Sequence, residues 1–360
     1  MKQVSAFHAA AMAMAISFSL SPVLADWPGI HFDATNNAAI PSAATVVDLG
    51  NDQQHTTTPN PLSTAIRPII AGSNVYTVAT ESSPADRIWI RAFDKTNLGF
   101  VADSADLDTG ISVSYGTASA PLADTANNAL YFATGSTMYR LNLADLTSTG
   151  PAWSTVMSDS NTAPAATYTV LNASPALGDG KVYIKTYPTA FGNITDAQTV
   201  AFDTTTGAVA WYSGSGGRGT SSPLYLEAGP NKLVIVDYQP TSNNVGLQAF
   251  DAASTGAATP VWTTATTYGA GGFHGVWGDM VAAGGKVYAV TTDVAFPGPS
   301  SGHLLKVDAA TGTVEQNVAI IGTDIPPIII GGVLHVLHED GNFVRYSTAD
   351  LSTIGSPASF

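Results

Sequence analysis

The residues of this 360-residue chain best suited to act together are His274, Trp277 and Asp279, in the stretch GGFHGVWGD. An imidazole, an indole and a carboxylate offer polar contacts and a stacking surface, and the flanking glycines let the backbone approach a ligand closely. Arg218, isolated among glycines and serines in SGSGGRGTSS, is a candidate contact for an anion. The alternative for GGFHGVWGD is a flexible glycine-rich loop with one packed Trp. The alternative for Arg218 is a solvated surface charge. These four residues are our candidate ligand-binding group, and we identify no catalytic residue.

Two histidines raise the question of a metal site. His335 and His338 lie three residues apart in HVLHEDG, on a strand that enters a turn, so their side chains should point to opposite faces. His335 also stands where related segments carry a Tyr. We therefore predict no metal site.

Charge and targeting signals restrict the class of protein. The chain has 13 basic and 27 acidic residues and a net charge of −14, which disfavours nucleic-acid binding. Residues 1–25 have the basic start, apolar stretch and small-residue end of a cleaved secretory signal. The sequence contains no cysteine, so it predicts no disulfide, no thiolate metal site and no lipid anchor. No stretch after residue 25 is apolar enough to span a membrane. We expect a periplasmic or secreted monomer.

The elements that must position the candidate residues follow from composition and repeats. Only 11% of residues are charged, whereas Gly, Ser, Thr and Ala are frequent, which favours many short strands. One recurring unit has Pro, apolar residues, a small turn and an apolar-aromatic strand, as in SPALGDGKVYIKT from Ser174. A second unit follows each copy, as in TVAFDTTTGAVAW from Thr199, and the pair occurs six times at a period of about 50 residues.

Each period fits four strands: a short strand after the Pro, the Val-Tyr strand, the Ala-Phe-Asp strand and a strand with Trp. The alternation before the Asp predicts a strand with one buried face, and the Asp and Gly predict a tight turn. Such units must stack on neighbours, and a ring does this without free ends. We predict an all-β fold: a single β-propeller over residues 26–360, built of four-stranded antiparallel blades.

The segment AFDTTTGAVAW (201–211) resembles the repeat of the pyrroloquinoline-quinone-like propeller family, with Ala-x-Asp-x-x-Thr-Gly-x-x-x-Trp after Pro-x-x-x-x-Gly-x-Val-Tyr. The resemblance covers the chain from about Arg67 onward; the third copy is complete, the fourth carries an insertion and the others are degraded. In that family the Trp packs on the Gly-containing turn of a neighbouring blade. The resemblance thus implies structural, blade-docking roles for the following residues: Trp153, Asp203, Gly207, Trp211, Asp251, Trp262, Asp308 and Gly312.

Blade number and closure of the ring follow from the ends of the repeat. Six copies indicate six blades, or seven if residues 26–60 form more than one strand. Residues 40–52 occupy the place of a Trp strand with no unit before it, so we expect them to complete the final blade and close the ring beside the C-terminal strand. Ligands should meet the face formed by the loops between blades and between second and third strands, which carries Arg218 and GGFHGVWGD.

Three functions remain open. The resemblance implies first a non-catalytic propeller, similar to periplasmic scaffold proteins of outer-membrane assembly, whose loops bind a protein or peptide partner in the cell envelope without a cofactor. The second is an alcohol or sugar dehydrogenase that uses pyrroloquinoline quinone and calcium, although the few Glu residues match no calcium motif of that family. The third is a secreted carbohydrate-binding propeller with aromatic side chains as stacking platforms.

Overall fold

The described part of the chain consists of strands, turns and connecting segments. A computed structural model describes residues 39–40, 68–81, 87–107, 118–147, 150–159, 166–167, 173–186, 197–214, 221–228, 230–241, 244–267, 273–276, 278–294, 300–323 and 325–359. Within these ranges it contains strands and no helix. No helix long and apolar enough to cross a membrane occurs in them. The predicted signal segment, residues 1–25, lies outside the described residues.

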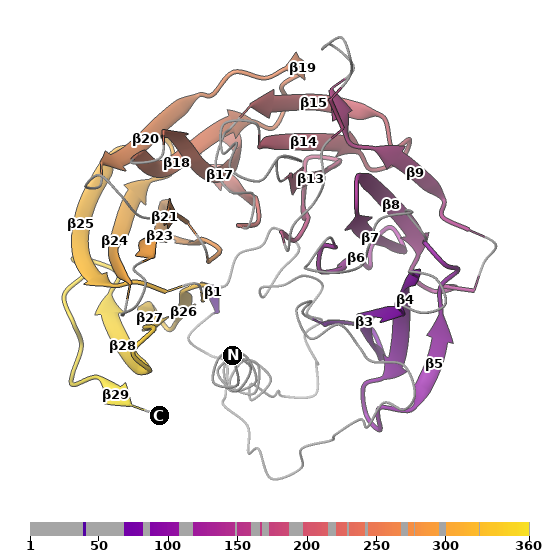
Figure 1. Ribbon diagram of the computed structural model, residues 1–360, viewed down its shortest axis with the longest axis horizontal. Helices are drawn as coiled ribbons and strands as arrows, with labels where there is room; N and C mark the ends of the chain where they lie inside the picture. Colours follow the sequence, from indigo (N-terminus) through magenta and orange to yellow (C-terminus); the bar gives the residue numbers. More distant parts are fainter. Residues whose placement is uncertain are drawn as a thin grey trace.

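Six sheets of four or five strands follow one another along the chain, and Figure 1 shows them around a common centre, from the first (indigo) to the sixth (yellow). The innermost strand of each sheet comes first in the chain and the outer strand last, as in the order β6-β7-β8-β9. The predicted four-stranded antiparallel units are therefore present. This is the arrangement expected of a β-propeller.

The strands of the first three sheets are the following. The first sheet has β2 (Ile69–Ala71), β3 (Asn74–Glu81), β4 (Arg87–Asp94) and β5 (Phe100–Asp103). The second has β6 (Leu122–Asp124), β7 (Ala129–Thr134), β8 (Thr137–Asn142) and β9 (Trp153–Val156). The third has β12 (Ala176–Gly178), β13 (Lys181–Lys185), β14 (Gln198–Asp203), β15 (Val209–Gly214) and β19 (Gly256–Ala257). A separate ribbon is formed by β10 (Ser158–Asp159) and β11 (Ala166–Thr167).

The remaining sheets complete the series. The fourth has β16 (Leu224–Ala228), β17 (Asn231–Thr241), β18 (Asn244–Asp251) and β20 (Trp262–Thr267). The fifth has β21 (Phe273–Gly275), β22 (Val281–Ala283), β23 (Lys286–Val294), β24 (Ser301–Asp308) and β25 (Val314–Ile321). The sixth has β1 (Ala39–Ile40), β26 (Ile328–Ile330), β27 (Val333–Leu337), β28 (Asn342–Ser347) and β29 (Ala358–Ser359).

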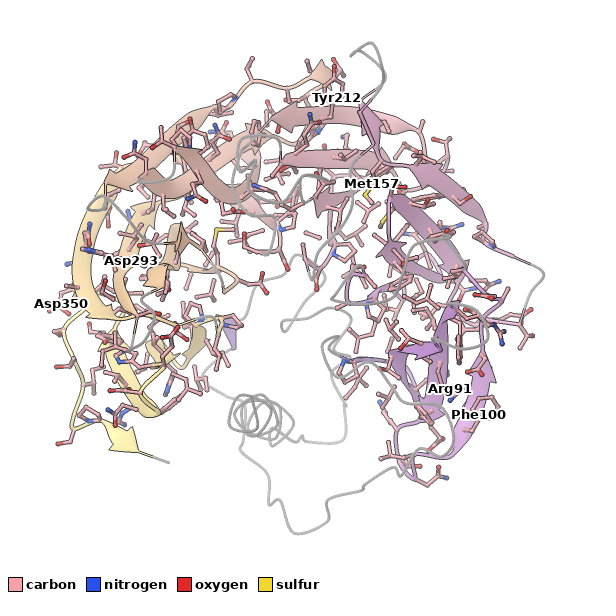
Figure 2. All side chains as sticks on the ribbon, in the orientation of Figure 1. Arg91, Phe100, Met157, Tyr212, Asp293 and Asp350 are labelled. Atoms are coloured by element: carbon pink, nitrogen blue, oxygen red, sulfur yellow. The ribbon has the colours of Figure 1, made fainter. Side chains whose placement is uncertain are left out.

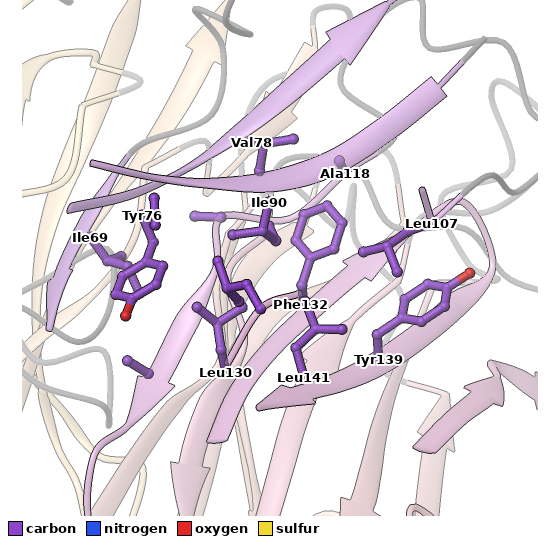
Figure 3. Packing of buried hydrophobic residues seen from close by; sticks show 14 of the residues in the cluster. Ile69, Tyr76, Val78, Ile90, Leu107, Ala118, Leu130, Phe132, Tyr139 and Leu141 are labelled. Carbon is purple, nitrogen blue, oxygen red and sulfur yellow. The ribbon is translucent and has the colours of Figure 1, made fainter. Parts of the chain in front are cut away.

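The middle strands are buried on both faces, which differs from the single buried face that their alternation predicted. In β14, Val200 and Phe202 pack toward the second sheet and Ala201 packs toward the fourth. Sheets pack face to face on both sides here, so small and large apolar residues alternate where polar residues would face water in an open sheet. Figure 3 shows one such core, in which Ile90 of the first sheet and Phe132 of the second pack together.

The two described residues of the N-terminal segment join the sixth sheet. β1 pairs in parallel with β26, with Ala39 opposite Ile329, and therefore lies at the inner edge of the sheet. The outer position beside β28 is taken by β29, close to the C-terminus. Residues 41–52 lie outside the described residues, so the expectation that residues 40–52 complete the final blade stays a prediction.

The turns after the third strands have one recurring structure. Asp203 Oδ1 accepts hydrogen bonds from the N–H of Thr205 and Thr206 at 3.0 and 2.7 Å, and Gly207 has φ of 73°. Asp308 makes the same contacts in the fifth sheet, where Gly312 has φ of 72°. In the fourth sheet Asp251 Oδ1 accepts the N–H of Ala253 at 2.8 Å. A short carboxylate thus satisfies the turn N–H groups, and Gly allows the left-handed turn residue.

A hydrogen bond with the same kind of donor and acceptor crosses each of the five interfaces between consecutive sheets. Its acceptor is always the carbonyl one residue after the turn Asp, or after the Asn142 or Ser347 that replaces it. The donor is a Trp of the outer strand or, where that strand lacks Trp, a Tyr of the second strand. The five bonds are Tyr76 Oη to Leu143 O (3.1 Å), Trp153 Nε1 to Thr204 O (3.1 Å), Trp211 Nε1 to Ala252 O (3.3 Å), Trp262 Nε1 to Ala309 O (3.0 Å) and Tyr288 Oη to Thr348 O (2.9 Å).

Two glycines separate the contribution of ring packing from that of backbone conformation. A Cβ at Gly312 would lie 2.6 Å from the Trp262 ring, whereas a Cβ at Gly256, with similar positive φ, would meet nothing within 4 Å. We expect Gly312→Ala to cost about 1–3 kcal/mol of unfolding free energy more than Gly256→Ala, because both pay for the left-handed conformation but only the first displaces an indole. Urea unfolding followed by Trp fluorescence measures the difference, and equal losses would contradict the expectation.

Stability should fall in acid partly through Asp308. Its ion pair with Lys286, with Nζ to Oδ2 at 2.8 Å, and its bonds from Thr311 lower the pKa of Asp308 to about 2. A carboxylate with a lowered pKa stabilises the folded state above its ordinary pKa and loses this effect as the pH falls toward 2. We expect Asp308→Asn to reduce stability by less than about 1 kcal/mol at pH 7, since the pair is partly exposed. In urea titrations the gap from wild type should narrow below pH 4; a constant gap would assign the effect to the turn alone.

Candidate functional site

Several ends of described segments lie near the starts of the inner strands of the third, fourth and fifth sheets. These ends are Ala173, Thr186, Ser221 and Gly278, each next to residues outside the described part of the chain. Direct hydrogen bonds and an ion pair link the residues at these ends. We call this set the loop-root cluster: Ser174, Lys185, Ser221, Ser222, Asp237 and Asp279.

One half of the cluster is an ion pair between sheets. Lys185, the last residue of β13, points its ammonium to Asp237 of β17, with Nζ 3.1 Å from Oδ1 and 2.8 Å from the Asp237 carbonyl oxygen. The Lys185 side chain is 0% exposed and that of Asp237 is 4% exposed. Ser221 Oγ donates to Asp237 Oδ1 at 2.6 Å. The third sheet and the start of the fourth are thereby fixed to one carboxylate.

The other half is a chain of hydrogen bonds that connects the starts of the inner strands in neighbouring sheets. The N–H of Ser174 donates to Ser222 Oγ at 2.8 Å, and the N–H of Ser222 donates to Asp279 Oδ1. Beyond Asp279, a Cβ at Gly278 would lie 2.9 Å from the Ile325 carbonyl group, so glycine permits the close approach of the sixth sheet. Four consecutive sheets thus touch in sequence along this line.

Burial dominates the electrostatics of the cluster. It lowers the pKa of Lys185 below the ordinary lysine value, and the Asp237 carboxylate acts in the opposite direction. A buried amine held by the carboxylate and the carbonyl oxygen of Asp237 is suited to fixing the geometry between the two sheets. Chemically, the cluster forms a rigid support from which the loops leave.

The predicted ligand-binding residues are distributed around this support. Asp279 is 4% exposed and holds the Ser222 N–H, so it joins two sheets. His274 lies in β21, a short strand at the inner edge of the fifth sheet, with Asp293 opposite it in the register; Figure 2 labels Asp293. Arg218 and Trp277 lie outside the described residues. Asp279 is thus buried and bonded at the start of an inner strand, and the grouping of the four residues as a ligand site stays a prediction.

The blade-docking residues lie at the interfaces. Trp153 and Trp262 lie against the turn glycines Gly207 and Gly312 of the following sheets. Trp211 is fully buried, and its ring lies 5.7 Å from that of Phe250 in the fourth sheet. Asp203, Asp251 and Asp308 hold the turns, as described above.

Sequence reasoning missed most of the loop-root cluster, although a signal was present. Lys185 and Asp237 are charged residues inside apolar strands, 52 residues apart, about one repeat. Ser174 and Ser222 both precede a Pro at the start of an inner strand. Opposite charges at buried positions of consecutive repeats indicate an ion pair across the interface between the two sheets.

The two histidines lie on opposite faces of the sixth sheet, as predicted. His338 Nε2 is 3.2 Å from the Tyr346 hydroxyl in the core shared with the fifth sheet, while the His335 ring lies 5.3 Å from that of Phe343 on the other face. Among the described residues, no group of three or more His, Asp or Glu side chains could hold a metal ion.

No protein-family model and no curated protein sequence matches the chain. Many solved structures resemble it, three of which are as follows. BamB from Moraxella catarrhalis has a TM-score of 0.55 at 13% identity, over 83% of this chain and 78% of BamB. The computationally designed Ika8 protein gives 0.50 at 10%, over 79% and 71%. Quinohemoprotein alcohol dehydrogenase from Comamonas testosteroni gives 0.46 at 12%, over 98% and 77%, too low a score to support an inference. The first two comparisons establish the fold alone: a β-propeller, in keeping with the quinone-type repeat that the sequence resembles.

Proposed function

We propose that this protein is an exported, non-catalytic propeller that binds a protein or peptide partner in the cell envelope through the loops that leave the loop-root cluster. The secretory signal pattern at the N-terminus and the repeat resemblance to periplasmic scaffold propellers support this proposal, together with the fold shared with BamB. The proposed ligand-binding residues are Arg218, His274, Trp277 and Asp279.

The observation that carries the proposal is the bonding within the loop-root cluster. Lys185 at the end of β13 and Asp237 in β17 are both buried in an ion pair between the third and fourth sheets. Asp279 is likewise bound to the backbone of a neighbouring sheet. A rigid support that carries several loops is how many binding proteins present variable contact residues.

The charge of the chain narrows the partner. At a net charge of −14, long-range repulsion disfavours strongly acidic partners. A neutral or basic protein surface is therefore the better match. Arg218 would then contact an isolated carboxylate of such a partner.

The test is cross-linking followed by binding of a defined partner. The mature protein, with a photo-reactive residue at position 218 or 277, is irradiated in an envelope extract, and the captured protein is identified, purified and titrated against wild type. We expect Arg218→Ala and Trp277→Ala to weaken that binding without changing the urea midpoint. Val261→Ser, on the fourth sheet at 51% exposure, is the matched surface control and should bind like wild type.

Two results would overturn the proposal. One is full binding by both loop variants, which would place the contact elsewhere. The other is dye reduction with an alcohol or aldose that depends on added pyrroloquinoline quinone and calcium, which would make the protein an enzyme.

A further inference from the structure

The interface between the third and fourth sheets changes from apolar to polar along its strands. Near the turn that joins β14 to β15, Ala201 and Trp211 are register partners and belong to the apolar cluster of this interface. Two residues further from that turn, the register aligns Lys185, Thr199 and Ser213 across the third sheet, and we call these three residues the polar row. Side chains two residues apart in a strand share a face, so the polar row also faces the fourth sheet.

The fourth sheet sets one polar side chain against this row. The rings of Trp211 and Phe250, 5.7 Å apart between centroids, show how the two sheets are aligned. Gln248 precedes Phe250 by two residues in β18 and pairs with Val236, which belongs to the same apolar cluster. Gln248 therefore faces the third sheet at the level of the polar row. Figure 1 shows these two sheets side by side, with β14 and β15 next to β17 and β18.

The uncharged polar groups at this level are buried, and two of them lack a hydrogen bond. Thr199 is 0% exposed, Ser213 2% and Gln248 5%. Within the described part of the chain, Ser213 Oγ and Gln248 Oε1 have no hydrogen-bond partner. Buried polar groups in folded proteins are almost always bonded, either to the protein or to ordered water. Two unbonded oxygens on opposite sides of one interface therefore indicate a group that lies between them.

The interface between the fourth and fifth sheets shows the apolar alternative. Leu247 lies four residues before the turn Asp of its sheet, as Thr199 does in the third sheet, and Leu305 lies three residues before the turn Asp, as Gln248 does. Both leucines are fully buried in one apolar cluster. Polar residues thus replace leucines on both sides of a single interface. Since Thr is also smaller than Leu, the polar level carries less side-chain volume on the third sheet.

We propose that a buried water molecule bridges Ser213 Oγ and Gln248 Oε1 between the third and fourth sheets. Water donates one hydrogen bond to the amide oxygen of Gln248 and another to the Ser213 hydroxyl or accepts one from it, and the Thr199 hydroxyl lies beside Ser213 in the register. Interior waters make two to four such bonds in polar sites. A cation fits less well, because the ammonium of Lys185 belongs to the same row. An anion fits less well, because Gln248 Oε1 is an acceptor.

A crystal structure of the mature protein tests this proposal. We expect electron density for one water within about 3.2 Å of both Ser213 Oγ and Gln248 Oε1. Gln248→Leu, which introduces the residue that the fifth sheet carries at this position, should lose that density. Ser213→Ala is a second, smaller change and should lose it as well. In solution, oxygen-17 magnetic relaxation dispersion counts long-lived internal waters, and we expect each variant to have one fewer than wild type.

Thr264→Ala is the matched control, because it removes the hydroxyl at the position in β20 that corresponds to Ser213 in β15. It should keep the water in both measurements. Crystals soaked in sodium bromide or rubidium chloride distinguish water from an anion or a cation, and we expect no anomalous peak at the site. An ion peak, a direct hydrogen bond between Ser213 and Gln248, or an unchanged count in both variants would overturn the proposal. The test needs no partner, so its result is independent of the proposed function.

Discussion

Asp237→Ala is expected to lower the free energy of unfolding by about 3–5 kcal/mol, because it leaves the ammonium of Lys185 buried without its carboxylate. Lys185 is fully buried, so water cannot replace the lost partner without opening the interface between the third and fourth sheets. Ser221 also loses its acceptor in this variant. Urea unfolding at pH 7, followed by Trp fluorescence and by circular dichroism, measures the loss.

A double substitution separates the charge from the packing. Lys185→Met together with Asp237→Leu removes both charges while keeping apolar volume, and buried pairs replaced in this way often retain or gain stability. We therefore expect the double variant to unfold at higher urea than Asp237→Ala. If both variants lose the same free energy, the ion pair is not the source of the effect.

Trp211→Ala is the second change with a large expected effect, about 3–5 kcal/mol of unfolding free energy. The side chain is fully buried and contacts the rings of Tyr183 and Phe250, each at 5.7 Å between centroids. Alanine would leave a cavity between the third and fourth sheets and remove the donor to the Ala252 carbonyl. The urea midpoint should fall accordingly.

Two further variants separate the contributions of the hydrogen bond and of burial to this loss of unfolding free energy. Trp211→Phe keeps most of the apolar contact and removes only the donor, so we expect a smaller loss that includes about 1 kcal/mol for the hydrogen bond. Trp153→Ala removes the equivalent but partly exposed residue and should also cost less than Trp211→Ala. Equal losses of unfolding free energy at Trp153 and Trp211 would show that the degree of burial does not determine the size of the loss.

Strand content and repeat boundaries could be predicted because they depend on local pattern. The stretch 199–211 encodes a strand, an Asp-stabilised turn and a second strand in consecutive residues, and each forms where its residues indicate. The turn geometry at Asp203 follows from the reach of a short carboxylate, which needs no tertiary information. The docking residues were identified through the family resemblance.

The features that local sequence patterns could not predict depend on which surfaces of the folded chain come into contact. β1 is only two residues long, and its place on β26 follows from the free inner edge of a distant sheet, which no local pattern reports. Asp279 follows a glycine-rich stretch in the sequence, and its hydrogen bond from the Ser222 N–H of another sheet could not be predicted from that local pattern. Contacts of this kind join residues that are far apart in the sequence, so only the folded structure reveals them.

The constant acceptor at the sheet interfaces explains how the repeats can diverge. Because the turn carbonyl belongs to the backbone, no substitution can remove it, while its donor moves between Trp211 on an outer strand and Tyr288 on a second strand. A lineage can therefore exchange one aromatic for the other at a junction while the bond persists. A Trp-based signature would recognise three of the five junctions, and the remaining two would look like unrelated sequence although they are joined in the same way.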